Sequence, residues 1–389
     1  MANPSLLTTL LLLLTGVVLV RISGRSLARW AVPAIVLELA VGFALGNSVL
    51  PFRAIAPLEG LTQLGVLALF FQVGLEARGD LLTSRRRTIL KVVGLSVLAP
   101  LLVFPALRFG FGMAPATALL CLAVLCATGT GVTLRVLAQR QALQSPSGRL
   151  LVGVSVLDDL PAVALLGAAA AMAGQSLGGH GSSPWAPFAI GLPLVALSWL
   201  AVGRMVKAGV AAPDQPVILL LLLVGCAWVG EVTGLTSLLG ALWAGVLLGR
   251  LQPPARALRE LLVPLAEVFL PLYFISVGMR LPAASLLEAR AWSLAGFLVV
   301  VALLCKLICA LGISAADRAE GVDGWVVAYG LIPRGLPGLV FATTALARGL
   351  IDPVQFAALV IMVSVTTVLG LVLLERRLAR IQTSSGLRS

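Results

Sequence analysis

Thirteen long apolar stretches, separated by charged or turn-forming residues, constrain this chain more than any other feature of its sequence. A helix needs about 20 mostly apolar residues to cross the hydrocarbon core of a bilayer. The composition excludes a soluble or disordered chain, because only 11% of the residues are charged and the mean hydropathy is +1.06. The sequence therefore predicts an all-α polytopic membrane protein with about 13 transmembrane helices. The stretches lie near 5–20, 31–50, 61–76, 89–108, 115–138, 149–172, 185–206, 216–232, 235–250, 261–279, 291–313, 324–348 and 354–375.

The positive charges alternate between the two ends of the predicted helices. Loops of one parity hold 21 of the 28 Lys and Arg residues and loops of the other parity hold five, while Lys306 and Arg334 lie inside helices. Because basic loops stay in the cytoplasm, this pattern predicts an N-terminus outside and a cytoplasmic C-terminus. The topology explains the net charge of +12. We therefore expect the lipid bilayer as a partner and no nucleic acid.

Short motifs recur at a nearly constant spacing of 203 or 204 residues. The recurring elements are GFALG at 42–46 with GVLLG at 245–249, F-x-x-V-G at 70–74 with the same pattern at 274–278, and Gly131 with Gly335. The spacing covers seven predicted helices, an odd number, so the second copy must cross the membrane in the opposite direction.

The chain 1–389 is therefore predicted to be a single membrane transporter domain built from inverted six-helix repeats. The first repeat occupies about 5–172 and the second about 216–375, with a connector helix at about 185–206. Transporters use such repeats to expose one central site to alternate sides of the membrane.

Two runs that break helices lie at related positions of the two halves. ATGTG occupies 127–131 and PRGLPG occupies 333–338. Interrupted helices at corresponding places of inverted repeats mark a binding site, because freed carbonyls and helix ends can face an ion. We expect Thr128, Thr130 and Arg334 on two broken crossing helices. Arg334 is expected to compensate the two helix C-terminal ends that meet there.

Three ionisable residues lie deep inside apolar segments. Asp158 and Asp159 are about ten residues into their segment, and Lys306 is near the middle of another. Each charge costs at least about 2.5–3.5 kcal/mol at the bilayer centre unless it is paired or hydrated. Carboxylate oxygens are hard ligands that hold an alkali cation or a proton. The natural partner of Lys306 is one of the two aspartates, although a purely structural Lys–Asp bridge remains the alternative.

We therefore predict an ion site in which Asp158 and Asp159 bind Na⁺. Lys306 is predicted to couple the movement of Na⁺ to the movement of protons. With the lysine protonated, these three residues carry a formal charge of −1. No cofactor is expected beyond the transported Na⁺ or K⁺ and H⁺. Glu38 and Glu267 also fall within apolar stretches, and for them we expect structural support through hydrogen bonds.

Several segments resemble bacterial monovalent cation/proton antiporters over essentially the whole chain. The most specific match is Asp158-Asp159 combined with Lys306, which resembles the electrogenic sodium/proton branch of that family. The matching segments read PAIVLELAVGFALGNSVL, LGVLALFFQVGLE, GLTSLLGALWAGVLLG, PLYFISVGMRL and LIPRGLPGLVFA.

The resemblance implies roles for individual residues. Asp159 would be the main ion ligand, and Asp158 would pair with Lys306. A core domain of the third to sixth and tenth to thirteenth helices would move against a dimerisation domain, which implies a homodimer in the bacterial inner membrane. Many relatives have a glutamate after Pro-Arg-Gly where this chain has Leu336-Pro337. The Kef-type relatives carry a cytoplasmic nucleotide-binding domain, and about fourteen residues follow the last predicted helix here, so we expect no regulation of that kind.

Two other classes of protein compete with the antiporter as explanations of these features. A sodium-coupled organic anion symporter has a similar inverted architecture and is the main alternative. An intramembrane aspartyl protease needs two aspartates on facing helices, one of them in a Gly-x-Gly-Asp context, whereas Asp158 and Asp159 are adjacent and follow Val-Leu. We therefore expect a transporter and not an enzyme.

Overall fold

The computed structural model of the protein is helical throughout the part of the chain that it describes. None of these residues lies in a β-strand. Among the described residues, four helical stretches are long and apolar enough to cross a membrane, namely Leu6–Ser23, Arg86–Gly110, Ala289–Gly312 and Pro353–Gln382. The all-α class is confirmed, whereas the number of spanning helices stays a prediction. The described residues are 6–27, 34–50, 52–76, 85–129, 133, 136–137, 140–142, 144–173, 186–209, 215–233, 237–251 and 255–386.

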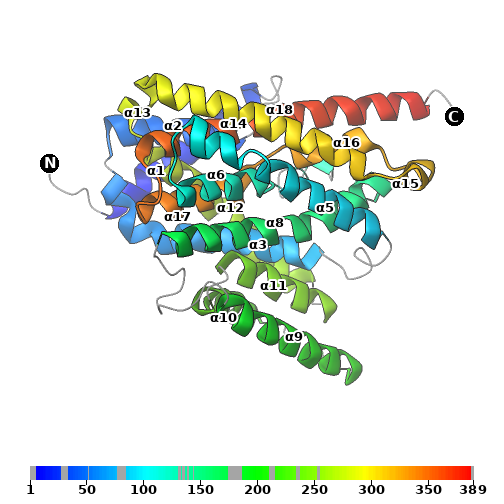
Figure 1. The fold of residues 1–389 in the computed structure, drawn as a ribbon. Helices are drawn as coiled ribbons and strands as arrows, with labels where there is room; N and C mark the ends of the chain where they lie inside the picture. The colour runs from blue at the N-terminus through cyan, green and yellow to red at the C-terminus, as the bar shows by residue number, and fades with distance from the viewer. Residues whose placement is uncertain are drawn as a thin grey trace. The chain divides into compact units, whose positions relative to one another are not determined.

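Figure 1 shows the order of the helices along the chain. They are α1 (Leu6–Leu27), α2 (Ala34–Ser48), η2 (Phe52–Leu58), α3 (Glu59–Glu76), α5 (Arg86–Leu101), η3 (Ala106–Gly110), α6 (Pro115–Cys126), α8 (Pro146–Met172), α9 (Ala186–Lys207), α10 (Pro216–Val232), α11 (Ser237–Arg250), α12 (Ala255–Met279), α13 (Ala283–Leu287), α14 (Ala289–Ile308), η4 (Cys309–Gly312), α15 (Ala315–Ala319), α16 (Gly324–Leu331), α17 (Gly335–Ala347) and α18 (Pro353–Gly386).

The last helix continues beyond its predicted end. The fall in hydropathy placed this end near 375, but α18 runs to Gly386. Charged residues such as Arg376 and Arg380 are good helix formers, so they end the apolar stretch without ending the helix. At about 1.5 Å per residue, the 34 residues of α18 exceed the length that the bilayer core requires.

The contacts within the chain define two compact units. Unit 1 consists of Met1–Leu19, Glu38–Gly79 and Ala170–Arg280, and unit 2 consists of Val20–Leu37, Asp80–Ala169 and Leu281–Ser389. The resemblance implied that the third and tenth predicted helices belong to the moving core. The corresponding helices α3 and α12 lie in unit 1, where α3 packs against both α11 and α12, whereas α5, α8, α14 and α18 lie in unit 2.

Glycines bring the backbones of α2 and α12 into direct contact within unit 1. A Cβ added at Gly42 would lie 2.0 Å from the carbonyl oxygen of Ile275, and one at Gly278 would lie 2.2 Å from that of Leu39. A larger residue at either glycine would have to push the two helices apart. This packing explains why α12 belongs to unit 1.

A second contact of the same kind joins α3 and α11. A Cβ added at Gly245 would lie 2.1 Å from the carbonyl oxygen of Phe71, and one at Gly74 would lie 2.0 Å from that of Leu242. Each of these four positions lies 203 or 204 residues from its counterpart in the α2–α12 contact. The repeated motifs therefore make two equivalent contacts, each of which joins the first half of the chain to the second.

Replacing Gly74 by Ala is expected to destabilise the protein by about 1–3 kcal/mol, because the added methyl group meets backbone and not a flexible side chain. Thermal unfolding of the detergent-solubilised protein, followed by tryptophan fluorescence, measures the loss. Gly94→Ala on α5 is the matched control, since a Cβ there meets nothing within 4 Å. Equal melting temperatures for Gly74→Ala and the wild type would contradict the close contact.

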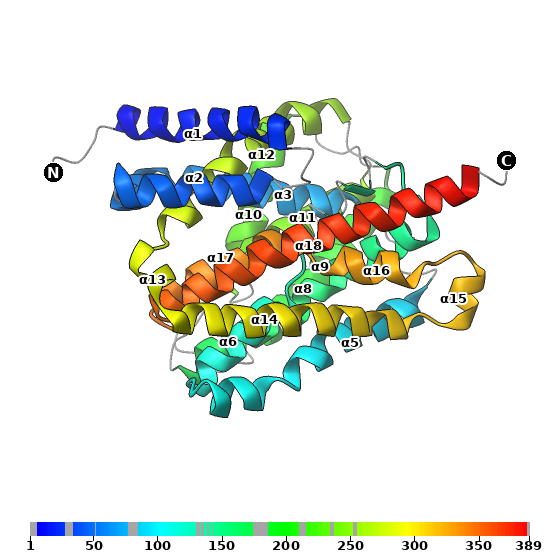
Figure 2. The ribbon, with the colours of Figure 1, turned by 90° about the horizontal axis from the view of Figure 1, so that it is seen from above.

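Unit 2 is built around α14, which packs against α5, α16 and α18. The helices α14 and α18 pack against each other, and Figure 2 shows them closest near their first residues and diverging toward their C-terminal ends. The core of this unit includes Ile89 of α5, Val154 of α8, Val327 of α16 and Leu374 of α18, all of them almost fully buried. These helices carry the residues for which the sequence predicted chemistry.

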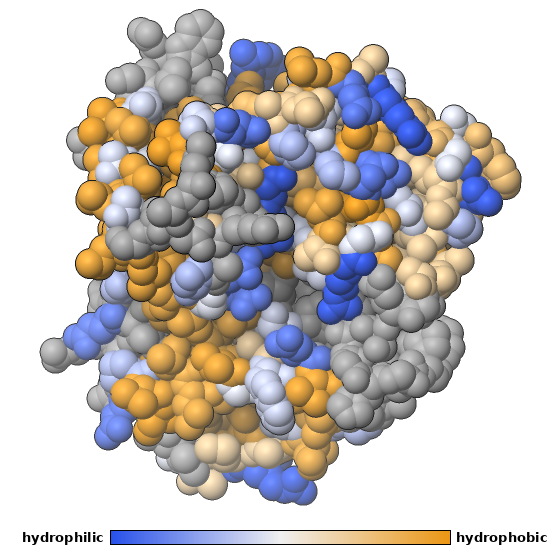
Figure 3. Space-filling model, turned by 90° about the vertical axis from the view of Figure 1, so that its left-hand side faces the viewer, coloured by the Kyte–Doolittle hydropathy of each residue, from blue (hydrophilic) through white to orange (hydrophobic). Residues whose placement is uncertain are grey.

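Apolar side chains are exposed over much of the surface, as the orange areas of Figure 3 show for one face. Leu102 is 82% exposed, and Val217 and Leu311 are each 75% exposed. Monomeric soluble proteins rarely expose large contiguous apolar areas. The surface therefore fits a multi-pass membrane protein whose helices face lipid.

A polar cluster ties the start of α5 to the connection between α14 and α16. Arg85 donates to Asp317 at 2.9 Å and to Glu320 at 2.6 Å, and Thr88 donates to Asp317 at 2.7 Å. The carboxylate of Asp317 also caps α15 by accepting from Ser314. Burial alone would raise the pKa of Asp317, but these hydrogen bonds outweigh it and hold the pKa below its ordinary value.

Replacing Asp317 by Asn is expected to lower the stability at neutral pH by roughly 1–3 kcal/mol, the range for a lost hydrogen bond to a charged group. Because the folded-state pKa of Asp317 is depressed, its contribution is fully present above the unfolded pKa of about 3.9 and is lost as the pH falls from there through the folded-state pKa. The difference between the melting temperatures of wild type and variant, measured from pH 7 to pH 3.5, should therefore become smaller at the acid end. A difference that is constant over this range would refute the assignment.

Candidate ion site

Asp158 lies at the centre of a buried polar cluster inside unit 2. It projects from α8, whose first residue is Pro146, a residue that suits the start of a helix. The carboxylate is completely buried. Its oxygen Oδ1 accepts a hydrogen bond from the hydroxyl of Ser96 on α5, and Oδ2 accepts from the hydroxyl of Thr128.

Lys306 of α14 completes the coordination of this carboxylate. Its Nζ donates to Asp158 Oδ2 at 2.9 Å, to Thr128 Oγ1 at 3.1 Å and to the carbonyl oxygen of Cys126 at 3.3 Å. Neither partner of this ion pair is exposed. Three acceptors match the three donors of an ammonium group, so the lysine is fully satisfied. The residues alone left open which aspartate pairs with Lys306, the family resemblance implied Asp158, and the geometry places Asp158 there.

The two helix-breaking runs meet beside this ion pair. α6 ends at Cys126, and the chain leaves the helix again between Leu331 of α16 and Gly335 of α17. The backbone nitrogen of Gly129 donates to the carbonyl oxygen of Pro333 at 2.5 Å. The two interruptions are therefore in direct contact.

Arg334 is also completely buried, and it neutralises the end of one broken helix. Its Nη1 donates to the carbonyl oxygen of Ala127 at 3.3 Å, just after the end of α6. Its Nη2 donates to the carbonyl oxygen of Ala302 at 3.4 Å, in the middle of α14, whereas we expected a bond to the second helix end. Positive groups stabilise helix C-termini, and α6 receives two of them, Arg334 and Lys306.

The formal charge of the cluster differs from the predicted value because Arg334 lies beside Asp158 and Lys306. The predicted charge of −1 counted both aspartates and the lysine alone. With the guanidinium included, the four residues together are formally neutral when both aspartates are ionised and Lys306 is protonated. The three of these residues whose side chains are described, Asp158, Lys306 and Arg334, are all completely buried.

None of the four other predicted residues has a side chain that the structure places in this cluster. Asp159 belongs to α8, but its side chain is outside the described residues, and Thr130 is outside them altogether. Glu38 is buried in α2, and Glu267 is exposed on α12. Both glutamates are in unit 1 and not in the unit that holds Asp158.

Ser96 is a member of the site that the sequence analysis missed. Its segment reads LKVVGLSVLAPLL, in which a single serine resembles any small helical residue. No charge or motif marks it. The depth of Ser96 in its helix could have indicated a role. Ser96 lies ten residues after Arg86, the first residue of α5, and Asp158 lies at a similar depth in its predicted segment.

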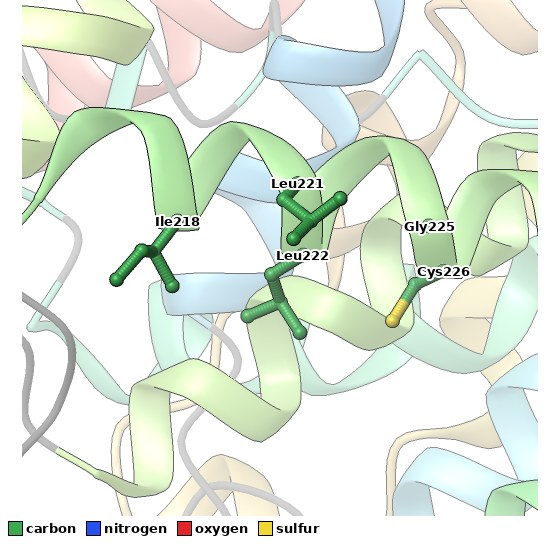
Figure 4. Close-up of a pocket in the computed structure, with 5 residues that line it drawn as sticks. All are labelled: Ile218, Leu221, Leu222, Gly225 and Cys226. Carbon is green, nitrogen blue, oxygen red and sulfur yellow. The ribbon is translucent and has the colours of Figure 1, made fainter.

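A hollow of about 330 Å³ beside α10 is of a different kind (Figure 4). Ile218, Leu221, Leu222, Gly225 and Cys226 line it. These residues offer no charged group, so this hollow does not suit an alkali cation.

Known proteins share the sequence pattern of almost the whole chain. The profile of the family described as "Sodium/hydrogen exchanger, transmembrane" matches residues 9–375. The chain belongs to this family. The resemblance read from the sequence is thereby confirmed.

Relatives within the sodium/hydrogen exchanger family are similar over most of their length. The chain is 31% identical over 328 residues to the high-affinity Na⁺/H⁺ antiporter NhaS3 of Synechocystis sp., covering 79% of this chain and 68% of that protein. It is 26% identical over 358 residues to the Na⁺/H⁺-K⁺ antiporter GerN of Bacillus cereus, covering 90% and 91% respectively.

A solved structure supports the same fold. The sodium proton antiporter MjNhaP1 from Methanocaldococcus jannaschii matches with a TM-score of 0.69, covering 96% of this chain and 98% of that protein. At 17% sequence identity, this match shows the fold alone. The exchanger fold is thus common to both chains.

Proposed function

We propose that this protein is a secondary antiporter that exchanges protons for a monovalent cation, with Na⁺ favoured over K⁺ and Li⁺. The fully buried pair of Asp158 and Lys306, beside two interrupted helices, is the observation that carries this proposal. Burying a charge pair costs several kcal/mol per ion, so a bridge with only a structural role would add little stability at this position. Membership of the sodium/hydrogen exchanger family and the names of the relatives point the same way.

Asp159 is the proposed ligand for which cation and proton compete. Asp158 already accepts three hydrogen bonds, one of them from the ammonium of Lys306, which leaves it little freedom to bind a cation as well. Thr128 lies next to the freed carbonyls of the first break. We propose that entry of the cation weakens the bond between Lys306 and Asp158, so that two protons leave for one cation and the cycle is electrogenic.

Inverted repeats are the proposed basis for alternating access. The matching glycine contacts of α2 with α12 and of α3 with α11 support this arrangement, since their positions differ by the repeat spacing of 203 or 204 residues. Transporters with such repeats rock one bundle against the other around a fixed site. We propose that unit 2 is the bundle that carries the ion.

The proposed location is the bacterial inner membrane, with the N-terminus outside, the C-terminus in the cytoplasm and two copies forming a homodimer. The alternation of basic loops supports the orientation. Native mass spectrometry from detergent, together with cysteine labelling from each side of the membrane, tests both parts of this proposal.

A sodium-coupled organic anion symporter is not favoured. Such a protein would take up an organic solute together with Na⁺ and would not move protons on addition of the cation. The similarity to proteins named as antiporters speaks against it.

Purified protein in liposomes that enclose a pH-sensitive dye tests the proposed function. Addition of Na⁺, Li⁺ or K⁺ to a vesicle with an acidic interior is expected to raise the internal pH, most strongly with Na⁺. Liposomes without protein give the leak rate. Proton movement equal to this leak with all three cations would refute the antiporter assignment.

A further inference from the structure

The hydroxyl of Ser96 is directed away from its own helix. Hydroxyls inside helices commonly bond to a carbonyl three or four residues earlier, and this chain offers examples. Ser276 donates to Tyr273 at 2.7 Å, and Ser364 donates to Val360 at 2.8 Å. Ser96, which is completely buried, donates from α5 to Asp158 on α8 instead.

The bond from Ser96 is placed so that the two oxygens of Asp158 have different surroundings. Oδ2 receives Lys306 and Thr128, whereas Ser96 is the donor to Oδ1 among the described residues. Removing this hydroxyl would leave a buried carboxylate oxygen without its donor, which is unfavourable. A monovalent cation is the group at this site that could satisfy such an oxygen.

We propose that Ser96 is a positioning residue that holds Asp158 toward Lys306 and keeps Oδ1 from binding the transported cation. This inference rests on the proposed antiport function. With Ser96 present, the cation meets one fewer anionic oxygen and leaves readily. Without it, Oδ1 becomes an additional hard ligand, which favours small cations and slows their release.

Ser96→Ala is expected to lower the KM for Na⁺ at alkaline pH by about tenfold, the factor that corresponds to one hydrogen bond to a charged group. The maximal exchange rate should fall at the same time. The KM for K⁺ should change less, so the preference for Na⁺ should increase. Ser96→Cys, which nearly keeps the volume but has only a weak donor, should show the same trend. Ser96→Thr retains a hydroxyl and should have the KM of the wild type.

Ser276→Ala is the matched control, because it removes another buried serine hydroxyl that bonds only within its own helix in the contacts described. Its KM for Na⁺ should equal that of the wild type. All variants are compared in the dye-loaded liposomes at pH 8.5 with Na⁺ and K⁺ in separate series. A merely structural role for Ser96 would lower the rate without a fall in KM.

The outcomes distinguish a failure of the proposed role of Ser96 from a failure of the proposed antiport function. A lower KM for Na⁺ in the Ala and Cys variants, absent in the Thr variant and in Ser276→Ala, supports the inference. An unchanged or higher KM in the Ala or the Cys variant overturns it, and the Cys variant decides if Ser96→Ala does not fold. Failure of the wild type to exchange any cation would instead contradict the proposed function.

Discussion

Replacing Asp159 by Asn is expected to reduce cation-dependent proton movement by about 100-fold or more, because loss of a charged ion ligand costs about 2–5 kcal/mol of binding. The amide keeps the volume of the side chain but removes both the charge and the titratable proton. We expect the variant to be produced and inserted like the wild type. Exchange in dye-loaded liposomes at equal protein content measures the effect.

Asp352→Asn is the matched control for this prediction. It makes the same chemical change at an exposed residue before α18, and its exchange rate should stay close to that of the wild type. Should folded Asp159→Asn move protons at nearly the wild-type rate, Asp159 is not the ligand for which cation and proton compete.

Replacing Lys306 by Gln is expected to destabilise the protein and to abolish its response to membrane potential. The substitution leaves the buried carboxylate of Asp158 without its ammonium partner, and breaking one side of a buried pair costs about 3–5 kcal/mol. Removing both charges, in Lys306→Gln combined with Asp158→Asn, should recover much of this loss, since neutral partners of similar shape are tolerated. Melting temperatures of the two single variants and the double variant measure this coupling.

The potential dependence is measured in vesicles with valinomycin and K⁺, with Na⁺ as the transported ion. One net charge per cycle means that about 100 mV biases the wild-type exchange by about 2.3 kcal/mol. The stabilised double variant should ignore the imposed potential. If the wild type also ignores it, the exchange is one for one and Lys306 has only a structural role.

Much of the site could be predicted because buried charges are costly and therefore rare. Lys306 stands alone inside an apolar helix and needs an acidic partner, and the structure brings Asp158 to it. The two breaks were predictable because Gly or Pro residues are concentrated in each run, whereas a single proline such as Pro161 lies inside a continuous helix. The contact between Gly129 and Pro333 joins runs that are about 200 residues apart, which their related positions in the repeats anticipated.

Other features could not be predicted because they depend on packing between helices. Ser96 has no charge, and only the three-dimensional arrangement directs its hydroxyl toward Asp158. The second bond of Arg334 goes to α14, since a guanidinium can reach several neighbouring carbonyls and packing selects among them. The assignment of α3 and α12 to unit 1 follows from glycine contacts such as that of Gly74, which a hydropathy pattern does not contain.

The apparent KM for Na⁺ as a function of pH tests the central claim most directly, namely that cation and proton compete for one buried carboxylate site. Wild-type protein in liposomes is assayed from pH 6 to pH 9 over a full range of Na⁺ concentrations. We expect the KM to fall by up to about tenfold per pH unit in the competitive range, while the maximal rate at saturating Na⁺ changes little. A KM that stays constant while the exchange rate changes with pH would contradict direct competition.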